Sequence, residues 1–212
     1  MTSSAFGRKL GQRAAAARIV VTSSQIAHLE KYYELLRRWN ARMNLTALAL
    51  EGLPDITIDR LFIEPLAAAR YVSNQPLTWL DIGSGGGSPA IPLKIVRPHA
   101  RLTMIESRGR KAAFLREVAR ALDLKAVEVQ NSRFEAFLER DGPKITVDLI
   151  TLRAVKADSE LFGLCRTALN LGGELLRFSS GPDIELHHKG FKQLKNVQLT
   201  AHGAFLDLFR AV

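Results

Sequence analysis

Hydrophobic positions follow two spacings along most of this chain. Short apolar runs typical of buried strands end in polar or glycine-rich segments, and apolar residues at helical spacing fill the intervals between them. The runs predict strands at residues 77–82, 101–106, 126–130, 146–151 and 174–178. Strands that alternate with helices form a mainly parallel sheet with both faces covered, so the pattern predicts an α/β fold.

The last third of the chain adds a different pattern. The helix after the fourth strand run is expected to reach about Asn170 and to stop at Leu171-Gly172-Gly173. Residues 196–201 and 205–212 flank His202-Gly203 and predict a terminal antiparallel hairpin. With the five earlier runs, this gives a predicted sheet of seven strands.

The pattern in the first 76 residues predicts helices. Thr22-Ser-Ser-Gln25 has the form of a capping box, and the helix that follows should run to about Asn40. Pro54 suits the first turn of another helix, which Pro65 should kink or restart. We predict one domain overall, in which a helical extension (22–76) packs on a core (77–212). Residues 1–21 carry four basic and no acidic residues and are expected to form a basic flexible arm.

A glycine-rich turn after the first strand indicates a ligand site. A dinucleotide fingerprint needs glycine or alanine at its third position, where this chain has Ser88. The pattern acid-x-Gly-x-Gly-x-Gly fits instead, on Asp81, Gly83, Gly85 and Gly87. This pattern resembles the first motif of class I S-adenosylmethionine-dependent methyltransferases.

Other strand ends carry further candidates for that site. Glu106 ends the second strand run, where an acid can accept hydrogen bonds from ribose hydroxyls. Phe134 and Glu135 follow the third run, with Phe134 able to cover an adenine base and Glu135 or the backbone able to meet its polar edge. Arg153 lies at the carboxyl end of the fourth strand, the edge where open α/β sheets hold ligands.

The charge balance adds a partner class. The chain has 30 Lys and Arg against 21 Asp and Glu, a net charge of +9, which predicts attraction to a polyanion such as RNA or DNA. The basic residues Arg37, Arg38 and Arg42 cluster at the end of one predicted helix. One interpretation is that this cluster is a solvated helix face, and the other is that it contacts phosphate.

Cysteine, histidine and hydropathy exclude several other classes. The single cysteine, Cys165, lies among apolar residues and is expected to fill the core, in keeping with a cytoplasmic protein. His187 and His188 have no cysteine or acid at ligand spacing, so they are expected to be exposed and no metal site is predicted. No apolar run is long enough for a membrane span, and we expect a monomer.

Taken together, several stretches resemble the bacterial 16S ribosomal RNA guanine-N7 methyltransferases, the RsmG family, also called glucose-inhibited division protein B. The resemblance runs from about Tyr33 to Gly173. It is carried by Trp39-Asn40, Asn44-Leu45-Thr46, Asp81-Ile-Gly-Ser-Gly85, Ile91-Pro92-Leu93, Arg97-Pro98, Phe114-Leu-Arg-Glu-Val118 and Arg153-Ala154.

The resemblance implies the fold of class I methyltransferases, S-adenosylmethionine as cofactor, and small-subunit ribosomal RNA as partner. It places cofactor contacts on Gly83, Ser88, Phe134, Glu135 and Arg153, with Glu106 in the ribose-binding place. It supports RNA contacts by basic residues, for which the candidates are Arg37, Arg38, Arg42, Arg60, Arg108, Arg110 and Lys111.

This chain departs from the family at four places. Ser88 replaces a bulky apolar residue, Leu152 replaces the serine of Ser-Arg-Ala, and Ser179-Ser180-Gly181 replaces Lys-Gly. The segment from Arg60 to Leu66, with Leu61, Glu64 and Pro65, stands where the family has Arg-His-Phe-Leu-Asp-Ser-Leu. Three alternatives therefore stay open: a paralogue that acts on another RNA, a small-molecule methyltransferase, and an RNA-binding relic without activity.

The implied chemistry needs no general base. Guanine N7 already carries a free lone pair in the plane of the base, so methyl transfer to it depends on alignment more than on proton removal. No Asp/Asn-Pro-Pro-Tyr segment typical of amine methylation is present. We therefore assign Arg153 a positioning role and predict no acid–base pair.

Overall fold

The computed structural model describes residues 4–141, 146–156, 158–181, 188–201 and 203–212. The elements, in chain order, are α1 (Ala5–Ala16), α2 (Ser23–Asn40), α3 (Asp55–Ile58), the π-helical turn η1 (Asp59–Ile63), α4 (Glu64–Ala68), the 3-10 turn η2 (Ala69–Tyr71), β1 (Thr78–Ile82), α5 (Ala90–Val96), β2 (Arg101–Ile105), α6 (Gly109–Ala121), β3 (Val127–Gln130), α7 (Phe134–Asp141), β4 (Val147–Arg153), α8 (Ser159–Ala168), β5 (Leu169–Ser179), β6 (Phe191–Thr200) and β7 (Ala204–Ala211).

The strands form one seven-stranded sheet in the order β3-β2-β1-β4-β5-β7-β6. The first five strands pair in parallel, and β7 pairs antiparallel with both β5 and β6. The predicted fold class, including the terminal hairpin, is therefore confirmed. Strand order reverses between β1 and β4, so the carboxyl ends of these two strands flank the crevice where such sheets hold ligands.

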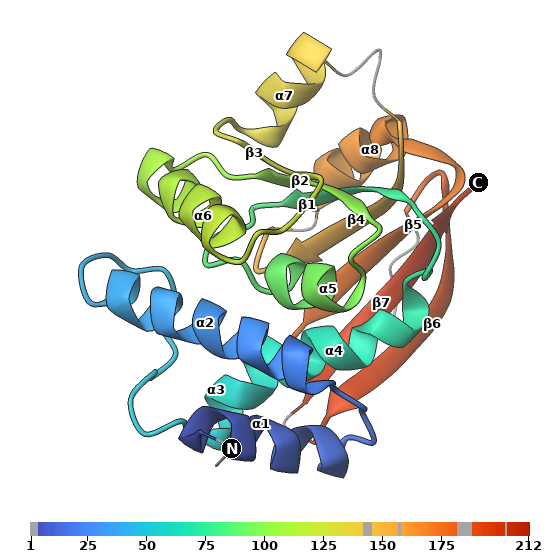
Figure 1. Ribbon diagram of the computed structural model, residues 1–212. Helices are drawn as coiled ribbons and strands as arrows, with labels where there is room; N and C mark the ends of the chain where they lie inside the picture. Colours follow the sequence, from blue (N-terminus) through green and yellow to red (C-terminus); the bar gives the residue numbers. More distant parts are fainter. Residues whose placement is uncertain (1–3, 142–145, 157, 182–187, 202) are drawn as a thin grey trace.

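Helices cover both faces of the sheet. One hydrophobic cluster joins the sheet to α1, α2, α4, α5 and α6, and a second joins it to α7 and α8. Figure 1 shows α2, α4, α5 and α6 together on one side of the sheet, with α8 on the other. Cys165 is fully buried in the second cluster, which confirms its role as a core residue, and burial raises the pKa of its thiol.

The prediction of a flexible arm at residues 1–21 is wrong for most of that segment. Residues 5–16 form α1, whose Phe6, Leu10 and Ala14 are spaced by four and buried. The ring of Phe6 stacks on Tyr33 with centroids 5.0 Å apart. Arg13 also forms an ion pair with Asp59. An apolar stripe between the basic residues thus docks the segment, a pattern that counting charges does not reveal.

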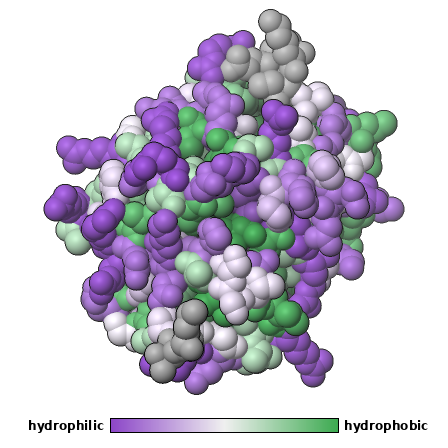
Figure 2. All heavy atoms as spheres, viewed as in Figure 1, coloured by the Kyte–Doolittle hydropathy of each residue, from purple (hydrophilic) through white to green (hydrophobic). Residues whose placement is uncertain are grey.

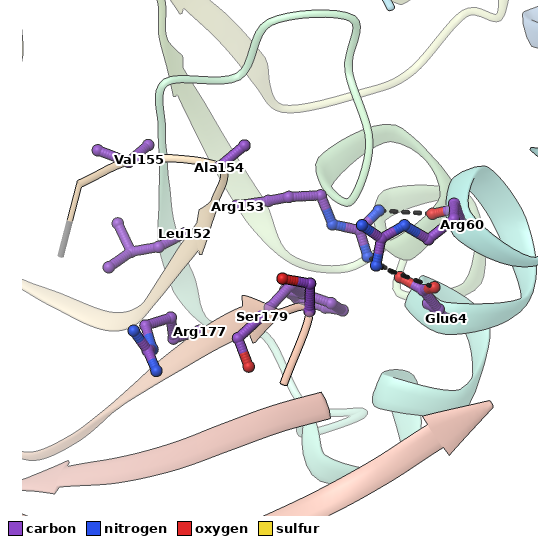
Figure 3. Close-up of a pocket in the computed structure, with 10 residues that line it drawn as sticks. Arg60, Glu64, Leu152, Arg153, Ala154, Val155, Arg177 and Ser179 are labelled. Atoms are coloured by element: carbon purple, nitrogen blue, oxygen red, sulfur yellow. Dashed lines mark hydrogen bonds and ion pairs between the residues drawn. The ribbon is translucent and has the colours of Figure 1, made fainter. Parts of the chain in front are cut away.

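The two prolines act as predicted in the helical extension. Pro54 is the N-cap of α3, and Pro65 stands in the first turn of α4. Because proline has no N–H, a continuous helix would lose a hydrogen bond there. The chain instead widens into η1, where the N–H of Glu64 reaches the carbonyl of Asp59, five residues back. This break aims Arg60 and Glu64 at the carboxyl ends of β4 and β5 (Figure 3).

Two predicted boundaries after α8 are wrong. The helix ends at Ala168, and the segment expected to stop it, residues 171–173, already belongs to β5. Pairing with β4 is irregular at that point, which accommodates Gly172 with a φ of +79°. The hairpin strand β6 begins at Phe191, five residues before the predicted start.

Of the two adjacent histidines, the structure describes His188. His187 lies outside the described residues. His188 is partly buried, and its ring stacks on Phe162 with centroids 3.3 Å apart, so the prediction that it is exposed is wrong.

Candidate functional site

The turn after β1 has backbone angles that favour glycine. Gly83, Gly85 and Gly87 have φ values of +70°, +55° and +93°. A Cβ on Gly83 would lie 2.8 Å from Cγ2 of Val155, and one on Gly87 would lie 2.9 Å from Cγ1 of Ile91. The turn therefore needs glycine at these positions, because a side chain on Gly83 or Gly87 would collide with Val155 or Ile91, which pack against its backbone.

Glu106 joins this loop from the end of β2. Its Oε2 accepts a hydrogen bond from the N–H of Gly85 at 2.9 Å, and its Oε1 accepts one from the N–H of Arg108 at 2.8 Å. Asn131, after β3, donates to the carbonyl of Glu106 at 2.9 Å. The structure therefore brings the predicted acid and the glycine turn together, and each carboxylate oxygen keeps a further lone pair for a ligand.

Asp81 is buried beneath the same turn. Its Oδ1 accepts a hydrogen bond from Oγ1 of Thr151 at 2.5 Å, and Thr151 accepts one from Nε1 of Trp79 at 2.9 Å. Its Oδ2 is buried and has no partner among the described residues. Burial raises the pKa of Asp81 to about 6. A buried acceptor without a partner costs free energy, which a cationic ligand group would offset.

Arg153 is the centre of a polar cluster at the end of β4 (Figure 3). Its guanidinium donates to the carbonyl of Arg60 at 2.5 Å and to Oγ of Ser88 at 3.0 Å, and it forms an ion pair with Glu64 at 2.7 Å. It also lies over the ring of Phe178, 4.6 Å from the centroid. The same side chain thus ties the sheet, the glycine turn and α4 together.

Burial changes the titration of both members of this pair. It raises the pKa of Glu64, which is 1% exposed, to about 7, against the opposing effects of Arg153 and Arg60. It lowers the pKa of Arg153 to about 10, so the guanidinium stays charged at neutral pH. Arg60 lies 3.8 Å from Glu64 and is 35% exposed, which makes it the more accessible cation of the cluster.

A cavity of about 240 Å³ opens beside this cluster, at the carboxyl ends of β4 and β5. Its walls carry Arg60, Glu64, Arg153 and Arg177, together with apolar and small residues. The opening is therefore rich in guanidinium donors, and among its described lining residues Glu64 supplies the carboxyl acceptor. Such a lining suits a planar polar ligand that offers both acceptors and donors.

Two residues of the cavity, Arg177 and Glu64, were not predicted as site residues from the sequence. Nε of Arg177 donates to Oδ2 of Asp207 at 3.0 Å, and Asn196 donates to Oδ1 of the fully buried Asp207 at 2.5 Å. These residues become neighbours only when β5, β6 and β7 pair, so no local spacing reveals them. Glu64 could have been predicted as a site residue because it is an acid within an otherwise apolar helical stretch.

The segment Trp39–Thr46 packs on the glycine turn. Oδ1 of Asn40 accepts hydrogen bonds from the N–H groups of Leu45 and Thr46 at 2.8 and 3.0 Å. A Cβ on Gly86 would lie 3.1 Å from the carbonyl oxygen of Leu45. From α2, the hydroxyl of Tyr32 donates to the carbonyl of Gly86 at 2.6 Å. The helical extension therefore supports the turn directly.

Phe134 and Glu135 are placed differently from each other. The ring of Phe134 is 4% exposed and packs in the second hydrophobic cluster, so the expected covering of a base by this ring does not match its position. Its apolar side chain gains more from the core under α7 than from a crevice. Glu135 lies exposed in the first turn of α7.

The predicted RNA-binding residues do not form one group. Arg38, Arg42 and Arg110 line a single groove between α2 and α6. Arg37 instead forms an ion pair with Glu51 at 3.4 Å, and Arg60 belongs to the cavity beside Arg153. Arg108 and Lys111 lie at the start of α6 without lining that groove.

In the part of the chain that the structure describes, no three His, Cys, Asp or Glu side chains gather in a way that could hold a metal ion. No described helix combines the length and the apolar character of a membrane-crossing segment.

Comparison with known proteins gives consistent matches. The model of the family GidB, described as rRNA small subunit methyltransferase G, matches residues 25–201. A ribosomal RNA small subunit methyltransferase G of Geobacillus kaustophilus (strain HTA426) is 33% identical over 83% of this chain and 73% of its own length. The protein of that name from Staphylococcus carnosus (strain TM300) is 37% identical over 76% and 67%, respectively.

Solved structures show the same fold at low identity. A SAM-dependent methyltransferase from Aquifex aeolicus superposes with a TM-score of 0.57 and 17% identity, over 76% of this chain and 96% of its own. A ribosomal protein L11 methylase from Lactobacillus delbrueckii subsp. bulgaricus gives a TM-score of 0.57 and 17% identity, over 70% and 76%.

Proposed function

The chain belongs to the rRNA small subunit methyltransferase G family, and we propose that it methylates N7 of a guanine in small-subunit ribosomal RNA. It is an S-adenosylmethionine-dependent methyltransferase. The observation that carries the proposal is the junction at the carboxyl ends of β1, β2 and β4, where the glycine turn, two acids and a cavity rich in arginine meet.

The residues present fit S-adenosylmethionine. Gly83, Gly85 and Gly87 have positive φ values that let the turn fold tightly, and a Cβ built on Gly85 would have only the carbonyl oxygen of Gly83 within 4 Å among the described residues, so the backbone there is open to a ligand. We assign Glu106 to the ribose hydroxyls, which can donate to its carboxylate. We assign the unpartnered Oδ2 of Asp81 to the amino group of the methionine moiety. When bound, the cofactor supplies a methyl group on a sulfonium.

The cavity beside Arg153 is our candidate site for the target base. Guanine offers the acceptor O6 and the donor groups N1–H and N2–H₂, whereas adenine offers a donor in place of O6. The partly exposed Arg60 can donate to O6, and Glu64 can accept from a donor edge. Arg153 holds Glu64 and Ser88 in place, so it orients the site without removing a proton.

The departure at Ser88 supports the enzyme over an inactive relic. Oγ of Ser88 donates to the carbonyl of Leu61 at 3.0 Å and accepts from Arg153, so the polar residue is satisfied within the cluster. Site residues that are mutually hydrogen-bonded in this way hold a fixed geometry. The net charge of +9 favours an RNA substrate over a small molecule. We also propose that the enzyme acts as a monomer in the cytoplasm.

Methyl transfer to small ribosomal subunits tests this function. Subunits purified from a strain lacking the gene are incubated with the enzyme and radiolabelled S-adenosylmethionine, and the labelled base is mapped in the RNA. We expect label on one guanine, and loss of label when the base is cleaved under conditions specific for N7-methylguanine. Label at another atom or in no RNA, from enzyme that binds the cofactor, would refute the proposal.

A further inference from the structure

A second concave surface lies away from the cavity beside Arg153. It is a groove of about 480 Å³ between the end of α2 and the first half of α6. We call it the α2–α6 groove; it is lined by Arg38, Trp39, Arg42, Met43, Arg110, Ala113 and Glu117. Figure 2 shows the face that carries α2 and α6, with hydrophilic side chains over most of it and hydrophobic atoms exposed between them.

The groove has uncompensated positive charge. Arg38, Arg42 and Arg110 are exposed, and none of them makes a hydrogen bond or ion pair with another described residue. Nearby basic residues differ, since Arg37 pairs with Glu51. The acid in the groove, Glu117, is also engaged, because Arg120 binds it at 3.0 Å. Three like charges, from the end of α2, the turn that follows it and the start of α6, therefore face one opening, an arrangement complementary to a polyanion.

The inner wall of the groove is apolar and contains an aromatic ring. Trp39 is partly buried, and its ring packs on Phe114 with centroids 5.7 Å apart. Met43 lies beside it in the lining. A flat aromatic ring fixed by core packing and surrounded by guanidinium groups offers a stacking surface together with phosphate contacts. This is the combination that single-stranded nucleic acid uses.

The groove adjoins the cofactor turn through both of its helices. Asn40, next to Trp39, holds the segment that packs on Gly86. The N–H of Arg108, just before α6, is bound by Glu106. An RNA chain seated in the groove therefore lies beside the turn that we assign to S-adenosylmethionine.

We propose that the α2–α6 groove binds an unpaired nucleotide of the RNA substrate, other than the target guanine. The base stacks on Trp39, and Arg38, Arg42 and Arg110 contact its phosphate and the neighbouring ones. This inference rests on the proposed function for the identity of the RNA. The groove then acts as a second anchor that holds the strand while the target guanine occupies the cavity beside Arg153.

Binding of a fluorescein-labelled 12-nucleotide single-stranded RNA to the full-length protein tests the groove. The test variant is Arg38→Gln, Arg42→Gln and Arg110→Gln combined. The control removes equal charge from exposed residues outside the groove, by Arg70→Gln, Arg101→Gln and Lys192→Gln. We expect the groove variant to bind about tenfold to a hundredfold more weakly than the control. The slope of the logarithm of its binding constant against the logarithm of the salt concentration should be less steep than that of wild type by about 2.

Tryptophan fluorescence supplies an independent measurement on the wild-type protein. The chain has two tryptophans, and Trp79 is 1% exposed, so a change caused by RNA reports on Trp39. We expect single-stranded RNA to quench this fluorescence, and an RNA of the same length with abasic sites to quench it much less.

The outcomes separate this inference from the function itself, because the titrations contain no cofactor. Equal RNA affinity of the groove and control variants would overturn the inference, even in an active enzyme. RNA binding without Trp39 quenching would also overturn it, since only phosphate contacts would remain. If the groove variant binds the RNA as tightly as wild type but no longer methylates intact subunits, the groove binds a ribosomal protein instead. That result would overturn the RNA assignment.

Discussion

At the scale of single residues, we expect the Arg153–Glu64 pair to combine a structural and a positioning role. Replacing Arg153 by Met leaves the buried Glu64 with the more distant Arg60 as its cation, and we expect a loss of about 3 kcal/mol in the free energy of unfolding. The double variant with Glu64→Leu should recover most of that stability. Methyl transfer should stay about a hundredfold low in both variants, because the donors that orient the site are absent.

Denaturant unfolding and single-turnover methylation, measured on the same preparations, check this expectation. Glu64→Leu alone is the third corner of the cycle and shows how much the carboxyl group itself contributes. If the stable double variant methylates at the wild-type rate, Arg153 serves only to join β4 to α4.

Asp81 predicts how cofactor affinity depends on pH. Its pKa of about 6 means that the carboxylate is ionised above that pH and takes up a proton below it. Because a cationic amino group binds the ionised form, affinity for S-adenosylmethionine should be highest near pH 7, where the carboxylate is ionised and the amino group is still protonated. It should fall about tenfold per pH unit below about 6.

Calorimetric titration between pH 4.5 and 8 measures this profile, with Asp81→Asn as the control. The Asn variant should bind weakly with little pH dependence. An equal acid-induced fall in that variant would assign the titration to another group.

At the scale of elements, α1 is part of the fold. Leu10 is fully buried between α1 and the helices beneath it, so Leu10→Ala should cost about 2–5 kcal/mol. Gln12→Ala changes the exposed side of the same helix and should alter stability by less than about 0.5 kcal/mol. Urea unfolding of both variants tests whether α1 is docked. If residues 5–16 were a free arm, the two variants would have equal midpoint urea concentrations.

The elements that sequence predicted well are those whose signals are local. The capping box of Thr22 and Gln25, the break at Pro65 and the turn at Gly83–Gly87 each depend on a few neighbouring residues. The prediction failed where distant pairing decides the outcome. Leu171 to Gly173 join a strand because β4 offers a partner edge there, against the tendency of glycines to end a helix.

The candidate site divides in the same way. Asp81 and Glu106 were found because acids at strand ends have a recognisable spacing, and the structure places both at the glycine turn. Arg177 escaped notice because its partner Asp207 lies on an antiparallel neighbour 30 residues away. Arg177 and Ser179 line the same cavity, which only the assembled sheet reveals.

At the scale of the whole molecule, we expect the helical extension and the core to unfold as one cooperative unit. A single hydrophobic cluster runs through both, and polar contacts cross between them, including Tyr32 to Gly86 and Arg153 to Glu64. Cofactor bound at the glycine turn should therefore stabilise α2 and α4 as well as the strands. At about 100 times its dissociation constant, a ligand adds about 2.7 kcal/mol, which raises the Tm of a domain of this size by roughly 5–10 °C.

Thermal unfolding with and without S-adenosylmethionine, followed by both far-UV and near-UV circular dichroism, tests this unity. We expect one transition in each case and coincident curves from the two probes. Hydrogen exchange should slow in α2 and α4 along with β1 when the cofactor binds, because opening of either helix breaks the contacts that support the turn. A separate early transition that the cofactor does not shift would show that the extension unfolds on its own, and Tyr32 and Glu64 would then contribute little to the site.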